Sequence, residues 1–180
     1  MDRLIRVNKA SDIPAVYQNT PIGLLIEYHN LKRKFDNYTN AQLLIGMCMD
    51  HRNNLHIPEV FTYRIRTGGA NLRYSEFKVS FAISIGGVKH IALIGHSDCG
   101  MVNLMSKKEQ FVQKLSENAG WSIEQAEEHF NNYALMFEIN NEIDFILSET
   151  LRLRQRYPKV QIAPIHYKVE DNLLYFIKED

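Results

Sequence analysis

Charge of one sign is not in excess in this sequence. Lys and Arg together number 21, and Asp and Glu together also number 21. A balanced charge argues against a partner nucleic acid or an anionic membrane, because binding to either needs an excess of basic side chains. No apolar run approaches the roughly 18 residues of a membrane span, and residues 1–16 show no export signal. We therefore expect a soluble, cytoplasmic protein.

Cysteine is also scarce. The two thiols, Cys48 and Cys99, are too few for a disulfide framework. A reducing compartment would keep both thiols reduced, so that no single disulfide forms between them. No stretch rich in Gly, Pro or Ser divides the chain, and 180 residues suffice for one sizeable core but hardly for two. We expect residues 1–180 to form a single domain.

Helical and strand patterns alternate along most of the chain, which predicts an α/β fold. The expected architecture is a mainly parallel central β-sheet flanked by helices, with a C-terminal strand pair at one end. The expected helices span residues 21–34, 75–84 and 140–157, and the expected strands lie within residues 41–50, 62–66, 89–100, 160–167 and 172–177.

Two segments are expected outside the central sheet. Residues 1–35 read as an N-terminal helical arm, and the charged residues 107–133 read as a helical excursion or part of an interface. Apolar side chains recur at helical spacing in the other expected helices, so we expect them to face the core. These predicted core residues include Phe77, Phe81, Ile143, Phe145, Ile146, Leu147 and Leu151.

Polar residues follow the expected strands, where open α/β sheets place their sites. Cys48, Asp50 and Arg52 alternate directly after the first strand. If the chain stays extended there, the thiol, the carboxylate and the guanidinium share one face. Residues 66–71 (Arg-Thr-Gly-Gly-Ala-Asn) form a second feature, a glycine loop whose backbone amides can approach a small ligand closely.

His96 and Cys99 follow the clearest strand, and a turn would bring these two side chains together. With Cys48 they supply two thiolates and one imidazole, a set that zinc prefers and that leaves a fourth position open. The alternatives are two buried thiols, a core histidine and a surface ion pair between Asp50 and Arg52.

Together these motifs resemble the β-class carbonic anhydrases, and in particular the compact members of that family. The shared signature is C-x-D-x-R, an arginine followed by a glycine-containing loop, and H-x-x-C. It occurs here as CMDHR, RTGGAN and HSDCG, in that order. The resemblance covers most of the chain. It departs from the family pattern at His51, where serine is usual, and within residues 67–71, where Asn-Ala-Gly is usual.

The resemblance implies Zn2+ as the cofactor, held by Cys48, His96 and Cys99, and a zinc-bound hydroxide that hydrates carbon dioxide to bicarbonate. Asp50 would accept a hydrogen bond from the bound water, or would bind the metal as a fourth ligand in a closed form. Arg52 would hold Asp50 off the metal. The pocket for this small-molecule substrate would include three glycines, and the chain would form a homodimer or a higher homo-oligomer. The pocket glycines are Gly68, Gly69 and Gly100.

Other functions stay open at this point. The altered glycine loop leaves room for hydrolysis of a sulfur analogue, carbonyl sulfide or carbon disulfide. A catalytically silent zinc-binding homologue and thiol redox chemistry between Cys48 and Cys99 are further alternatives, although no C-x-x-C motif supports the last. Asp98 is expected to be a turn or cap residue, and His51 either a proton shuttle or a packing residue.

Overall fold

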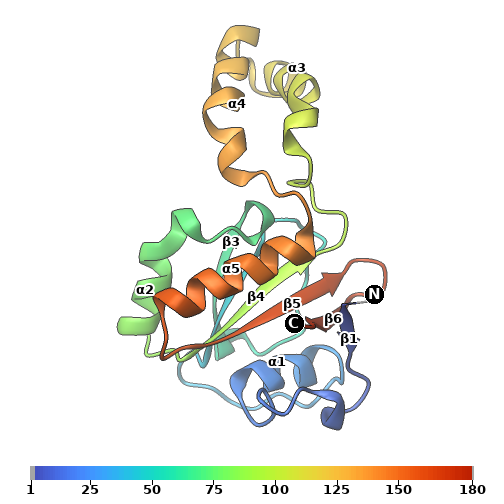
Figure 1. Cartoon of the computed structure of the whole chain (residues 1–180), viewed down its shortest axis with the longest axis vertical. Coiled ribbons are helices and arrows are strands. Elements are labelled where there is room, and N and C mark those ends of the chain that lie inside the picture. Colours follow the sequence, from blue (N-terminus) through green and yellow to red (C-terminus); the bar gives the residue numbers. More distant parts are fainter. Residues whose placement is uncertain (1–2, 180) are drawn as a thin grey trace.

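The computed structural model describes residues 3–179 and contains one six-stranded sheet (Figure 1). Its strands are β1 (Leu4–Arg6), β2 (Leu43–Cys48), β3 (Thr62–Thr67), β4 (His90–His96), β5 (Gln161–Lys168) and β6 (Leu173–Ile177). Across the sheet they follow the order β1-β6-β5-β4-β2-β3. Strands β3, β2, β4 and β5 pair in parallel, whereas β6 and β1 are antiparallel additions at one edge.

This topology confirms the expected α/β fold with its mainly parallel sheet. The strands β5 and β6 are the expected C-terminal pair, joined by a turn in which Asn172 adopts a φ of 56°. The edge strand β1 was not predicted. It lies in the segment expected to be a helical arm, and its three residues are too few to show an alternating pattern.

Helices cover both faces of the sheet (Figure 1). Helix α1 (Pro21–His29) packs on one face, against Leu43 and Ile45. Helices α2 (Glu76–Ser84) and α5 (Glu142–Arg156) pack on the other, against Leu44 and Leu93. Side chains alternate between the two faces of a strand, so the continuous apolar runs of β2 and β4 fill both cores.

Several details of the helices differ from expectation. Helix α1 ends at His29, five residues earlier than predicted. Phe77, Phe81 and Leu151 were predicted to be core residues but are exposed, and Phe77 retains 83% of its accessible surface. Phe77 and Phe81 are exposed because α2 buries its opposite face, through Val79 and Ala82. Phe145 is only partly buried against the α5 core.

Helices α3 (Lys108–Ala119) and α4 (Ile123–Phe137) form a hairpin that projects away from the sheet (Figure 1). It occupies the region where the sequence predicted a helical excursion. The turn between the helices contains Gly120, whose φ is 74°, and Ser122 caps α4. A small core of its own holds the hairpin together, made of Val112, Ala126, Phe130 and Ala134. Among residues 3–179, no helix combines the length and the apolar content needed to cross a membrane.

Candidate metal centre

The candidate metal centre lies at the carboxyl ends of two neighbouring parallel strands. Cys48 ends β2, His96 ends β4, and Cys99 follows in the turn after β4. All three side chains are buried, and their ligand atoms lie within 4.8 Å of one another. The Sγ atoms of the two cysteines are 3.9 Å apart. The structure therefore brings together the three residues that the sequence suggested as ligands.

The arrangement of these donors fits a zinc ion. His96 Nδ1 donates to the carbonyl oxygen of Ser97 at 2.9 Å, which leaves the lone pair on Nε2 free for a metal. Nε2 is buried and has no hydrogen-bond partner among the residues that the structure describes. Two thiolate sulfurs bound 2.3 Å from one tetrahedral zinc would lie about 3.8 Å apart, close to the observed separation.

The two thiols share their protons unequally. A hydrogen bond from Cys99 holds the pKa of the Cys48 thiol well below its ordinary value. The same contact, together with burial, raises the pKa of Cys99. The site therefore favours a thiolate at Cys48 and a neutral thiol at Cys99. A bound cation would offset the repulsion between two thiolates and so allow Cys99 to ionise as well.

Asp50 and Arg52 form a close ion pair next to the cluster. Arg52 Nη2 donates to Asp50 Oδ2 at 2.7 Å, and Nε donates to Oδ1 at 3.0 Å. These hydrogen bonds hold the pKa of the Asp50 carboxyl far below its usual range. The expectation of an extended chain at this point is wrong, because His51 and Arg52 lie in a turn. In that turn the Arg52 backbone N–H also donates to Asp50 Oδ1, at 2.9 Å. The His51 side chain is 95% exposed.

Arg66 shapes the loop that carries Asp50, a role that sequence reasoning missed. Its guanidinium donates to the backbone carbonyl oxygens of Cys48 and Asp50, both at 3.2 Å, and to that of Asn53 at 2.7 Å. Arg66 is the next-to-last residue of β3, close to the glycine loop, so it was visible in the motif. Nothing in the local sequence indicates which carbonyl groups it binds, because these lie up to 18 residues away.

The glycine loop lies directly against the side chains that cover the cluster. Gly69 adopts a φ of 61°, and a Cβ there would meet Met101 and Ile139 at 3.4 Å. It lines a small enclosed space with His96 and Cys99. Gly68 instead lines a larger cavity nearby, whereas Gly100 is exposed and lines neither space.

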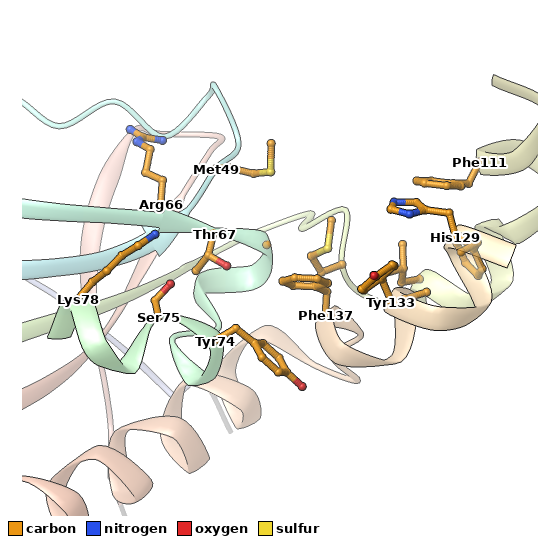
Figure 2. Close-up of a pocket in the computed structure, with 15 residues that line it drawn as sticks. Met49, Arg66, Thr67, Tyr74, Ser75, Lys78, Phe111, His129, Tyr133 and Phe137 are labelled. Carbon is orange, nitrogen blue, oxygen red and sulfur yellow. The ribbon is translucent and has the colours of Figure 1, made fainter. Parts of the chain in front are cut away.

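That larger cavity, about 540 Å³, separates the body of the protein from the helical hairpin (Figure 2). Lys78 and Tyr74 approach it from α2 and from the turn before it. Phe111, Tyr133 and Phe137 line the hairpin side (Figure 2). The lining is therefore aromatic and mostly apolar.

Two residues of the segment after α4 close over the cluster and were not predicted as site residues. Ile139 belongs to the same buried cluster as both cysteines. The Glu142 carboxylate accepts a hydrogen bond from the Cys99 backbone N–H at 3.3 Å. They lie more than 35 residues beyond the last motif in the chain, and only the fold places them here.

Comparison with known proteins agrees with this geometry. A sequence profile of the carbonic anhydrase family matches residues 44–173. The chain therefore belongs to the carbonic anhydrase family, and its fold is that of the β class. A comparison with curated protein sequences finds no match.

Solved structures with the same fold include two carbonic anhydrases and one carbon disulfide hydrolase. The β-carbonic anhydrase isoform I of Trichomonas vaginalis has 17% identity and a TM-score of 0.64, covering 82% of this chain and 90% of that chain. The carbonic anhydrase of Glaciozyma antarctica has 20% identity and a TM-score of 0.60, covering 76% and 83%. The apo form of a carbon disulfide hydrolase has 21% identity and a TM-score of 0.56, covering 78% and 80%.

Proposed function

We propose that this protein catalyses the zinc-dependent reversible hydration of carbon dioxide to bicarbonate. The observation that carries the proposal is the buried cluster of Cys48, His96 and Cys99 beside the ion pair of Asp50 and Arg52. A zinc ion held by the three cluster residues would supply the Lewis acidity that makes water a hydroxide nucleophile near neutral pH.

The protein's own residues would orient the reacting water. Arg52 keeps Asp50 ionised, so the Asp50 carboxylate can only accept hydrogen bonds. Accepting a hydrogen bond from the attacking water would fix that water's lone pair toward the substrate carbon. Arg66 holds the backbone on either side of Asp50 and so limits the movement of the carboxylate.

Apolar walls suit a small apolar substrate. Met101 and Ile139 lie against the glycine loop, and Ile139 shares a buried cluster with the cysteines. Neither side chain offers a strong hydrogen bond to water, so both favour a gas over competing polar solutes. We place the substrate in the adjoining cavity, which Gly68 and Met101 line, because Met101 and Ile139 already lie against Gly69. Gly100 is the weakest of the three suggested pocket residues because it is exposed.

A sulfur analogue is the second candidate substrate. The same walls, and the methionines Met49 and Met101 on the neighbouring cavity, would accept carbonyl sulfide or carbon disulfide as readily as carbon dioxide. The fold is shared with a carbon disulfide hydrolase, which keeps this substrate class open. Release of hydrogen sulfide from either gas is the discriminating reaction.

Stopped-flow hydration of carbon dioxide by the zinc-loaded protein tests the proposal. We expect hydration well above the uncatalysed rate between pH 7 and 9, a large loss in Asp50→Asn, and no loss in Glu117→Gln. Glu117 is a suitable control because its ion pair with Lys114 lies on the projecting hairpin. Hydrogen sulfide release without hydration would favour the sulfur analogue, and neither activity would favour the silent zinc-binding homologue.

We further propose that one domain of residues 1–180 works as a homodimer or larger homo-oligomer. Phe77, Phe81 and Ile85 form an exposed apolar row along α2 and its C-cap, with Tyr63 of the edge strand β3 beside it. Such a row is costly to leave in water and suits an interface with a second copy. Because two ligand thiols must stay free, we place the protein in a reducing compartment such as the cytoplasm.

A further inference from the structure

Arg52 is held by two acidic side chains, one on each of the loops that carry the candidate metal ligands. Its Nε and Nη2 groups donate to Asp50, while Nη1 donates to Asp98 Oδ2 at 2.9 Å. Nη2 also donates to the backbone carbonyl oxygen of Asp98 at 3.0 Å. The two carboxylates therefore use separate N–H groups of the guanidinium, so that neither displaces the other.

Asp98 lies in a turn, as the sequence predicted, and the turn also directs its carboxylate toward Arg52. It lies between His96 and Cys99 with a φ of 56°, a conformation that Asp, Asn and Gly adopt more readily than other residues. The neighbouring Ser97 Oγ donates to Glu170 and accepts from a backbone N–H of the β5–β6 connection. The Asp98 acceptor therefore sits on an anchored segment of chain.

We propose that Asp98 is a positioning residue that fixes Arg52 and, through Arg52, the orientation of the Asp50 carboxylate. This inference rests on the proposed function. Asp50 and Arg52 lie in one short turn and would otherwise move together. The contact with Asp98 ties that turn to the turn of the other two ligands. Without it, Asp50 is the only acidic partner of Arg52 among residues 3–179.

Loss of the Asp98 contact would leave the pair of Arg52 and Asp50 more mobile and would change the binding of anions at the cluster. When Arg52 can follow Asp50, the carboxylate spends more time turned toward the cluster, where its charge competes with an incoming anion. The Asp98 side chain is 83% exposed and the Arg52 side chain 34% exposed, so solvent screens their contact. The effect of losing it is therefore modest, about two- to fivefold in anion affinity.

Two substitutions distinguish the side-chain contact of Asp98 with Arg52 from the backbone conformation of the turn. Asp98→Asn keeps the left-handed conformation and an acceptor but loses the charge. Asp98→Gly keeps the conformation and loses the whole side chain. We expect anion affinity to fall in the order wild type, Asp98→Asn, Asp98→Gly, with unchanged affinity in Glu117→Gln as the matched loss of an exposed, ion-paired acid.

The test uses the full chain loaded with cobalt(II), titrated with thiocyanate and followed by visible absorption. Each Asp98 variant is made in the wild-type background and in the Arg52→Ala background, which gives a double-mutant cycle. We expect the two- to fivefold weakening only where Arg52 is present. A role of Asp98 in the turn alone would weaken thiocyanate binding equally in both backgrounds.

Three results would overturn the inference. Equal effects in both backgrounds would show that Asp98 acts without Arg52, and no effect in the wild-type background would show that it positions nothing. In both cases the metal site and the proposed function would stand. The proposed function and the inference would both be overturned if the wild-type protein took up no cobalt. The same holds if thiocyanate left the visible spectrum of the cobalt-loaded protein unchanged.

Discussion

Gly95 links the packing of the sheet to the candidate metal centre, because it precedes His96 on β4 and faces helix α5. A Cβ at this position would lie 2.7 Å from Ile146 Cγ1, well inside van der Waals contact. Ile146 is fully buried and cannot swing into solvent. In Gly95→Ala, either α5 or the end of β4 must therefore move. Such overpacking costs about 1–3 kcal/mol of unfolding free energy, and any movement of β4 displaces His96.

Guanidinium unfolding followed by circular dichroism measures this cost, and Ile146→Ala provides the rescue. The single substitution Ile146→Ala should cost about 2–5 kcal/mol through its cavity. The double variant should lose less than the sum of the two, because the new methyl group enters that cavity. Gly100→Ala is the stability control, since its Cβ meets nothing within 4 Å. An unchanged stability in Gly95→Ala, or strict additivity with Ile146→Ala, would refute the reasoning.

Three further predictions concern the site, the pH dependence and the assembly. Arg52→Ala should lower carbon dioxide hydration about 10- to 100-fold with zinc content unchanged; loss of the metal would show that Arg52 has been misassigned. Burial lowers the pKa of His29 to about 4, so the unfolded state binds more protons between that pH and about 6.5. The unfolding free energy should therefore fall by up to about 3 kcal/mol as the pH drops through this window. His29→Gln should reduce this dependence of the unfolding free energy on pH. A pH dependence as steep as that of the wild type in His29→Gln would contradict the assignment to His29. Phe77→Lys should convert the proposed oligomer to monomers in light scattering after size exclusion, whereas an unchanged oligomer mass would place the interface elsewhere.

The sequence predicted the central sheet because its strands are strongly patterned. The runs around Leu44 and Leu93 are continuously apolar, and each ends in polar residues, as expected for buried parallel strands. Phe77 and Phe81 misled the prediction because helical spacing shows which residues share a face of α2. It does not show whether the sheet or another surface covers that face.

Some residues of the candidate site could be predicted from short sequence motifs, whereas others reach it only through the fold. The three candidate ligands and Asp50 with Arg52 belong to short motifs, so their chemistry is visible in the sequence. Ile139 and Glu142 approach from the segment after the hairpin, and their contacts with the cluster depend on how α5 docks on the sheet. The contact between Arg52 and Asp98 spans 46 residues, a separation at which spacing carries no information.

Metal content per chain, measured by elemental analysis on wild type and Cys99→Ser side by side, tests the central claim most directly. Cys99 supplies one of the two candidate thiolate ligands, and serine keeps its size while removing the soft donor. The account predicts about one zinc per wild-type chain and a weakened or lost site in the variant. Wild-type protein without metal after reconstitution, or equal zinc in both proteins, would contradict it.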